Sequence, residues 1–430
     1  MTASIYLPCP RTPGSSGRPK SRLAGRTSLA ALLALLAFAP VAECERTKPA
    51  SRDAPVRLAQ EAVGRWTLRY VDLTDTPHGG TVQDYASYEG TWSPTWSPDG
   101  RRLLYWRFAQ GPRDVLEQLD VVTLRTKTLL EVSRKQGFSV ACAPDDGRIA
   151  YVVRESANYD QLAELWVSDA KMKDRTLVAH IPFAAMLRWS PDGRWLAWLH
   201  RWHGPASIRA LDTRAREEPA PTELTRLSPE APYLYHFCWA SDGKGVYFMD
   251  RPLAATGDDL FYVDLASHAR RQVCQERVAW AVFAARVTQL FPVASEGRVY
   301  VAAQYTGLCG LLDRDDGPGP DIVSVDLRRG VVEHVCPTFH RTSSLAPNGR
   351  EVIYLNPQAG TLLWLPALDW SREDAKIIRK LEESELALIR FPSFDLDAAK
   401  RIGAPTWSPD GRRVLVQFGN RFIVLTRVNR

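Results

Sequence analysis

The sequence predicts an all-β fold, a seven-bladed β-propeller of four-stranded blades, from three observations. The string Trp-Ser-Pro-Asp-Gly recurs along the chain. Each copy is followed by a basic or polar residue and then by an apolar stretch of strand length. The copies follow one another at intervals of roughly 50 residues, which is close to the length of one propeller blade.

The repeat has three complete copies and four looser ones. The complete copies cover residues 96–100, 189–193 and 407–411. The looser copies cover residues 143–147, 239–243, 295–297 and 346–349.

The repeat has the chemistry of a tight turn between two antiparallel strands. Pro fixes φ where the turn begins, Asp accepts a hydrogen bond from a backbone N–H further on, and Gly supplies a positive φ. Trp ends the preceding strand and offers a large flat face for packing between sheets. We therefore predict structural rather than catalytic roles for these positions. They are Trp96, Asp99, Gly100, Trp189, Asp192, Gly193, Trp239, Asp242, Gly243, Trp407, Asp410 and Gly411.

The spacing of the repeats predicts the number of blades. The copies from Asp99 to Asp242 follow one another at steps of about 50 residues, and the next clear copy, at Asn348, comes after roughly twice that distance. Counting the degenerate copy at 295–297 between them gives seven blades. The alternative is six blades, with one unit as an insertion.

The two chain ends predict how the ring of blades closes. After Asp410 about 20 residues remain, which is room for two strands and not for four. The missing outer strand is expected to come from residues 66–72, ahead of the first repeat, because pairing the two ends removes an open sheet edge. Residues 371–389 depart from the pattern and fit either a short helix or an outer strand followed by a loop.

The first 42 residues are predicted to be a secretory signal peptide. Five basic residues and no acidic ones precede the apolar run 29–39, which is too short to span a bilayer. Residues 43–63 have linker composition, and the propeller is expected over 64–430. Cys44 would carry a lipid in a bacterial lipoprotein, but Glu43 stands where a lipobox needs a small residue.

Most of the net charge belongs to this leader. The formal charge is +6 for the whole chain, and without the five basic residues of the leader it falls to about +1. The charge therefore does not indicate nucleic-acid binding, and no stripe of basic and aromatic residues indicates it either. The composition, 45% hydrophobic and 24% charged, is that of an ordinary globular protein.

Trp-Ser-Pro-Asp-Gly followed by a basic residue and an apolar strand resembles the repeat of TolB-like propellers, over about residues 64–430. Members of that family include periplasmic proteins that bind other envelope proteins and the propeller halves of prolyl-oligopeptidase-type peptidases. Some related propellers are pectic-oligosaccharide lyases whose metal is held by several His. The resemblance implies the fold and an envelope location but leaves the function open. It does not extend to the N-terminal α/β domain of TolB, because only about 20 residues separate the predicted signal from the propeller.

The chain lacks the common catalytic signatures. No G-x-S-x-G elbow follows the signal segment and no α/β segment follows the last repeat, so a peptidase domain is not expected. There is no Gly-rich phosphate loop, H-E-x-x-H or C-x-x-C string. His200 and His203 form a close pair that could begin a metal site, although such sites usually need three or four ligands. The alternative is a surface pair at a blade edge.

The cysteines divide into two groups. Cys274, Cys309 and Cys336 are the candidates for a disulfide in an oxidising compartment. Cys142 and Cys238 are equally well explained as buried free thiols.

Five residues are predicted at the mouth of the central channel, where propellers usually bind ligands. They are Arg188, Tyr235, His236, Arg286 and His340. A ring of Tyr, His and Arg could bind a peptide or a carbohydrate by stacking and charge-assisted hydrogen bonds. The alternative for each residue is ordinary packing in an inner strand.

These observations favour an exported, non-catalytic β-propeller, periplasmic or secreted, that binds a protein or peptide partner at the cell envelope and needs no metal or other cofactor. One alternative is a metal-assisted carbohydrate lyase or hydrolase that uses His at the channel mouth. Another is a scaffold tethered to the membrane through a lipid on Cys44.

Overall fold

The computed structural model describes the part of the chain between residues 60 and 428, with gaps. The described ranges are 60–63, 66–73, 81–82, 94–108, 113–133, 136–154, 162–181, 184–200, 206–215, 220–229, 237–250, 257–273, 279–280, 285–293, 297–305, 321–337, 342–349, 351–356, 361–366, 389–390, 405–418 and 420–428. The predicted signal peptide, Cys44 and most of the linker lie outside these ranges, as do residues 371–388. The chain divides into residues 1–53 and 54–430, and all the described residues belong to the second unit.

The described strands form seven antiparallel sheets, which we number 1 to 7 in chain order. Sheet 1 contains β3 (Thr81–Val82), β4 (Thr95–Trp96), β5 (Arg102–Phe108), β6 (Arg113–Asp120) and β7 (Thr126–Ser133). Sheet 2 contains β8 (Gln136–Cys142), β9 (Ile149–Arg154), β10 (Ala163–Ser168) and β11 (Arg175–Ile181). Sheet 3 contains β12 (Ala184–Trp189), β13 (Trp195–His200), β14 (Ser207–Asp212) and β15 (Thr222–Arg226).

The second half of the chain supplies the other four sheets. Sheet 4 contains β16 (Phe237–Trp239), β17 (Gly245–Asp250), β18 (Gly257–Asp264), β19 (Arg270–Gln272) and β20 (Ala279–Trp280). Sheet 5 contains β21 (Ala285–Val293), β22 (Arg298–Tyr305), β23 (Asp321–Asp326) and β24 (Val332–Pro337). Sheet 6 contains β25 (Thr342–Leu345), β26 (Glu351–Asn356), β27 (Thr361–Pro366) and β28 (Ile389–Arg390). Sheet 7 contains β29 (Thr406–Trp407), β30 (Arg413–Phe418), β31 (Arg421–Arg427), β2 (Trp66–Asp72) and β1 (Gln60–Val63).

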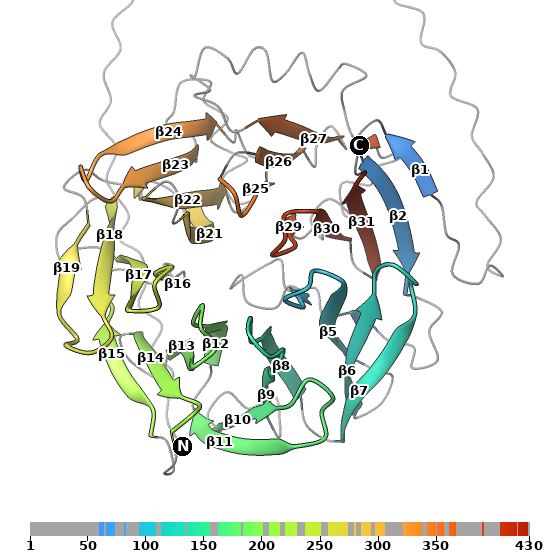
Figure 1. The fold of residues 1–430 in the computed structure, drawn as a ribbon, viewed down its shortest axis with the longest axis horizontal. Helices are drawn as coiled ribbons and strands as arrows, with labels where there is room; N and C mark the ends of the chain where they lie inside the picture. The colour runs from blue at the N-terminus through green and yellow to red at the C-terminus, as the bar shows by residue number, and fades with distance from the viewer. Residues whose placement is uncertain are drawn as a thin grey trace, which may run out of the picture. The chain divides into compact units, whose positions relative to one another are not determined.

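Strands that follow one another in the chain are neighbours in most of these sheets. Sheets 2, 3, 5 and 6 are four-stranded meanders, and in sheets 1 and 4 one further short strand pairs off the main path. Figure 1 shows first strands such as β8, β12 and β16 toward the middle of the drawing, and last strands such as β7, β11 and β15 outside. The all-β prediction is therefore confirmed for the described residues, which contain no helix and hence none long and apolar enough to cross a membrane.

Each sheet packs against the next, and sheet 7 packs against sheet 1. Sheets 5 and 6 contact each other through β22 and β25, and buried apolar clusters join the other neighbours. Representative members are Trp106 and Tyr151 (sheets 1 and 2), Leu165 and Trp198 (sheets 2 and 3), Ala210 and Phe248 (sheets 3 and 4), Met249 and Val301 (sheets 4 and 5), Ile353 and Trp407 (sheets 6 and 7), and Phe422 and Tyr105 (sheets 7 and 1).

Sheet 7 combines the two ends of the described chain. All seven residues of β2 pair with β31, from Trp66 opposite Arg427 to Asp72 opposite Arg421. Trp66 and Trp407 meet edge to face, with ring centroids 5.9 Å apart. The strand expected over residues 66–72 thus lies beside the last strand of the chain, and β1 adds a fifth strand outside it.

The repeat tryptophans make the same hydrogen bond at four boundaries between sheets. Each indole Nε1–H donates to a backbone carbonyl on the inner strand of the preceding sheet, one residue before the position equivalent to Trp. The pairs are Trp96 to Thr406 (3.3 Å), Trp189 to Ala141 (3.2 Å), Trp239 to Arg188 (2.9 Å) and Trp407 to Ser344 (3.0 Å). The tryptophan of the repeat therefore supplies a polar link as well as an apolar face.

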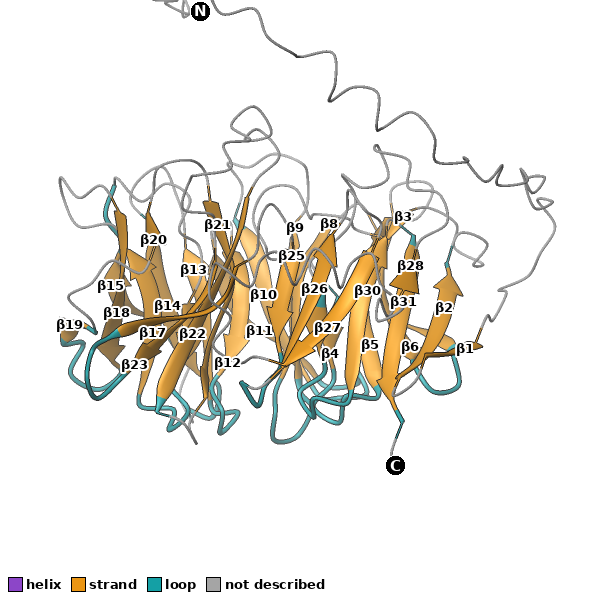
Figure 2. Ribbon diagram, turned by 90° about the horizontal axis from the view of Figure 1, so that it is seen from above, coloured by secondary structure: helices purple, strands orange, loops and turns teal. Residues whose placement is uncertain are grey.

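The repeat turns adopt the geometry that their residues dictate. The Asp99 and Asp192 carboxylates each accept a hydrogen bond of 3.0 Å from the backbone N–H two residues later, and the pKa of each is lowered below its usual value. Gly193 has a φ of 66°, and a Cβ there would lie 2.0 Å from Asp145 Oδ1 of the neighbouring turn. Figure 2 shows the turns, in teal, together along one edge of the sheets.

Candidate functional site

Only part of the predicted channel-mouth set lies in the described residues. Arg188 is described in full, and Arg286 is described as backbone in β21. Tyr235, His236 and His340 lie outside the described ranges. The structure therefore describes no contact among the five.

The two described members do not occupy equivalent places. Arg188 is the last residue but one of β12, whereas Arg286 is the second residue of β21. Both strands are the first of their sheets, so Arg188 lies toward the end that carries the repeat turns and Arg286 toward the opposite end. The repeat alone does not show where the inner strand begins, so the sequence predicts one mouth for two residues that lie at opposite ends of their strands.

Arg188 follows an irregularity in the backbone of β12. The ladder between β12 and β13 shifts between Ala185 and Arg188, so Met186 and Leu187 together stand opposite Trp198. Met186 has a φ of 58°, which costs a residue with a side chain about 1–2 kcal/mol. Such bulges redirect the side chains beside them and are frequent next to functional sites.

The Arg188 side chain carries a positive charge for which the described part of the chain supplies no anionic partner. The Arg188 side chain is exposed to solvent. The protein around the guanidinium lowers its pKa, with the Cys238 thiol of β16 as neighbour. Burial raises the pKa of Cys238, so this thiol stays protonated and does not balance the charge. Among the described residues no carboxylate forms an ion pair with Arg188. The exposed guanidinium is therefore available to an anionic group from outside the chain.

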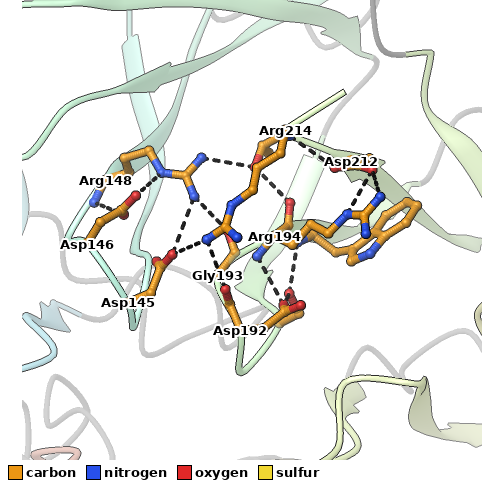
Figure 3. A network of polar contacts seen from close by, with 11 residues as sticks. Asp145, Asp146, Arg148, Asp192, Gly193, Arg194, Asp212 and Arg214 are labelled. Atoms are coloured by element: carbon orange, nitrogen blue, oxygen red, sulfur yellow. Dashed lines mark hydrogen bonds and ion pairs between the residues drawn. The ribbon is translucent and has the colours of Figure 1, made fainter. Parts of the chain in front are cut away.

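The charges at the nearby turns are, by contrast, well paired. Arg148 Nη2 donates to the Gly193 carbonyl at 2.8 Å, and so joins the turns of sheets 2 and 3 (Figure 3). Arg214, just after β14, contacts the carboxylate of Asp145, which lies in the turn between β8 and β9. Arg194 Nη2 lies 2.6 Å from the Asp212 carboxylate. These arginines hold neighbouring turns together, which distinguishes them from Arg188.

His200 ends β13, and the second member of its predicted pair, His203, lies outside the described residues. Burial and the nearby Arg209 lower the pKa of His200 to about 4, so its imidazole is neutral at physiological pH. Within the described ranges no three His, Cys, Asp or Glu side chains are grouped as metal ligands would be.

The described cysteines are free thiols. Cys142 and Cys238 form no disulfide, and burial raises the pKa of Cys142 to about 12. Cys274 and Cys309, two of the three disulfide candidates, lie outside the described residues, and Cys336 is described only as backbone of β24.

Asp114 forms a polar link between sheets 1 and 2. Its buried carboxylate accepts a hydrogen bond of 3.0 Å from the Gly137 N–H at the start of β8. Burial raises the pKa of Asp114 to about 6, because one hydrogen bond only partly replaces the lost hydration. Ionisation of this carboxyl therefore opposes folding.

We expect Asp114→Asn to make the protein more stable in neutral and alkaline solution. The stability that the neutral carboxyl contributes is complete below about pH 4 and is lost as the pH rises through about 6. Asn keeps the acceptor and cannot ionise, so at pH 8 the variant should exceed the wild type by about 3 kcal/mol, and at pH 4 the two should be nearly equal. Urea unfolding at both pH values measures this.

Asp326→Asn is the matched control, with the opposite sign. Hydrogen bonds from the Arg329 and Arg328 backbone N–H groups and the Arg329 guanidinium lower the pKa of Asp326 to about 2. This variant should lose stability at neutral pH and lose less as the pH falls toward 3. A difference between Asp114→Asn and the wild type that does not change with pH would contradict the assignment for Asp114.

Sequence reasoning missed the backbone bulge at Met186 and the buried Trp198 that stands opposite it. A left-handed residue is usually signalled by Gly or Asn, and Met gives no such signal. The surrounding sheets impose this conformation, so a single sequence holds no mark of it.

The comparisons with known proteins bear on the fold. No protein-family model matches the chain, and no curated protein matches it. A structure of oligogalacturonate lyase in complex with manganese is similar, with a TM-score of 0.56 and 14% identity over 87% of this chain and 97% of that one. Hydrazine synthase from Kuenenia stuttgartiensis is similar with a TM-score of 0.52 and 16% identity, over 79% of this chain and 96% of that one.

TolB from Acinetobacter baumannii also aligns, with 16% identity over 82% of this chain and 64% of that one. Its TM-score of 0.41 is too low to carry an argument. The first two likenesses support a propeller fold for this chain, and at these identities they show nothing about its activity.

Proposed function

We propose that this protein is an exported, non-catalytic β-propeller that binds a protein or peptide partner at the cell envelope. In this proposal the seven sheets are seven blades, and the pairing of β2 with β31 closes the ring. The partner binds along the inner edges of the sheets and places an acidic group against Arg188. The resemblance of the repeat to TolB-like propellers supports the envelope location and the partner class.

The observation that carries the proposal is the unpaired charge of Arg188. Its side chain is exposed, and no carboxylate among the described residues forms an ion pair with it. The arginines at the turns beside it are paired and occupied with the fold. An acidic partner would compensate the Arg188 charge through charge-assisted hydrogen bonds.

Capture from an envelope extract tests the proposal. The mature full-length chain is immobilised, and bound proteins are identified by mass spectrometry. We expect one partner to be retained. The amount retained should fall when His236 and His340, at the predicted channel mouth, are both replaced by Ala. Unchanged binding by a folded double variant would reject the channel-mouth site.

The carbohydrate lyase is the second candidate, and the fold likeness to oligogalacturonate lyase favours it. That reading needs a metal held by His side chains, and His236 and His340 are the available candidates. Metal analysis of the purified protein decides: a stoichiometric divalent ion that is lost with both His would support the lyase over the binding protein.

The position of the mature N-terminus remains part of the proposal. We expect cleavage after Ala42 and a free Glu43 in the periplasm or outside the cell. Diacylglycerol on Cys44, seen by mass spectrometry of the intact protein, would instead establish the lipid-tethered scaffold.

A further inference from the structure

Three nitrogen atoms that can donate hydrogen bonds gather without partners on one face of sheet 3. Trp198 is completely buried, and its Nε1–H has no hydrogen-bond partner. Buried Nδ1 of His200 and buried Nε of Arg209 also lack partners. Trp198 stands directly opposite Arg209 in the ladder between β13 and β14, and His200 lies two residues further on the same face. We call Trp198, His200 and Arg209 the donor cluster.

The donor cluster lies at the boundary with sheet 2. Trp198 belongs to the apolar cluster that contains Val152 and Leu165 of sheet 2. Water is scarce in such a boundary, so an unsatisfied hydrogen-bond donor there is unfavourable unless another group accepts its hydrogen bond.

The backbone opposite Trp198 is also unusual. The bulge of β12 places Met186 and Leu187 against this one residue, and Met186 has a φ of 58°. A bulge interrupts the ladder where the unmet indole lies, and strain of this kind concentrates at ligand sites. The bulge and the unmet donors are independent observations at one place.

The charges around the donor cluster define what it would accept. Arg209 Nη2 lies 3.4 Å from Glu223, and the same carboxylate lies 2.6 Å from Arg226 Nε. Two guanidinium groups thus share one carboxylate, while His200 is neutral. These three side chains carry a net charge of +1, and buried Arg154 of β9 lies on the face of sheet 2 that packs against Trp198. The surroundings therefore favour an anion, and a carboxylate offers two acceptor oxygens to the donors.

We propose that the donor cluster is a binding subsite for the carboxylate of a small organic acid. The indole N–H of Trp198 and the Nε–H of Arg209 donate to the carboxylate, and the neutral imidazole of His200 donates through Nδ1. The subsite is separate from Arg188, so it does not depend on the partner-binding proposal.

Thermal unfolding of the full chain in sodium acetate, against sodium chloride at equal ionic strength, tests this subsite. We expect a saturable rise in Tm with acetate and no comparable rise with chloride. Trp198→Phe removes the Nε1–H donor together with the five-membered ring of the indole, and Arg209→Gln removes the charge, so each should weaken the apparent acetate affinity at least tenfold. Arg194→Gln, on the same sheet and paired with Asp212, is the control and should keep the wild-type affinity.

Trp198→Phe keeps the test decisive even if Arg209→Gln unfolds. Without acetate this variant should be less stable than the wild type, because the smaller ring leaves a cavity in the core. The quantity compared is therefore the rise in Tm that acetate gives each variant above its own Tm in chloride. Acetate should also shift the indole Nε1–H resonance that Trp198→Phe removes. Butyrate in place of acetate distinguishes a subsite for the smallest acids from one that accepts a carboxylate on a longer chain.

The proposal is overturned if acetate raises Tm no more than chloride does. It is also overturned if acetate stabilises Trp198→Phe and the wild type equally, which would mean adventitious binding only. Loss of partner capture by the channel-mouth variants would leave these acetate results unaffected, so the two proposals fail separately.

Discussion

Gly137→Ala should destabilise the protein by about 3 kcal/mol or more, the largest effect expected of a single added methyl group. A Cβ at this position would lie 2.1 Å from Trp106 Cδ2. Trp106 is 2% exposed and cannot swing away, because it packs against Tyr151 in the boundary between sheets 1 and 2. The methyl group must therefore push β8 away from sheet 1, which also strains the hydrogen bond from Gly137 to Asp114. Urea unfolding of the purified variant measures the loss.

Gly297→Ala is the matched control for this collision. Gly297 has a φ of 61°, and a Cβ there would meet nothing within 4 Å. The free energy of unfolding of that variant should fall by only about 1–2 kcal/mol, the cost of placing a residue with a Cβ in the left-handed backbone conformation. Trp106→Leu is itself destabilising, but in that background Gly137→Ala should cost much less than in the wild type, because the colliding ring is gone. Equal losses in the two Ala variants, or an undiminished cost of Gly137→Ala in the Trp106→Leu background, would contradict the packing described for sheets 1 and 2.

Deleting residues 64–73 should cost far more stability than deleting residues 43–62. The first deletion removes β2, which pairs with β31 along seven residues and buries Trp66, Leu68 and Val71. Burying each such side chain contributes about 1.5–3 kcal/mol, so the sum is comparable with the whole stability of an ordinary domain. Differential scanning calorimetry of the two deletion variants measures the difference.

The same deletion tests ring closure. Without β2, β31 becomes an exposed sheet edge, and we expect aggregation as well as a lower Tm. Removing residues 43–62 takes away most of β1 and leaves β2 in place. Equal Tm values for the two deletion variants would contradict closure through β2.

The sequence predicts the repeating part of this fold because the residue types in each repeat determine the turn that it forms. Pro, Asp and Gly at fixed spacing form the same turn at Gly100 and Gly193, with a positive φ in each. The strand expected over residues 66–72 is present as β2 and pairs with β31.

The candidate site is less predictable because it depends on contacts between sheets. The left-handed Met186, the unmet indole of Trp198 and the unpaired Arg188 arise where β12 is bent against its neighbours. The sequence predicts Arg188 as a binding residue, whereas neither residue type nor spacing marks Met186 or Trp198. His236 and His340 remain predictions, because they lie outside the described residues.

Arg188 provides the most direct test of the binding function. The measurement is the dissociation constant of the captured partner for the wild type, Arg188→Gln and Arg194→Gln, by calorimetry at fixed salt. Because a hydrogen bond to a charged group contributes about 1.5–3 kcal/mol, Arg188→Gln should weaken binding about tenfold or more, and Arg194→Gln should bind like the wild type. Equal affinities of the wild type and a folded Arg188→Gln variant would contradict the proposal that this protein binds its partner at the inner edge of sheet 3.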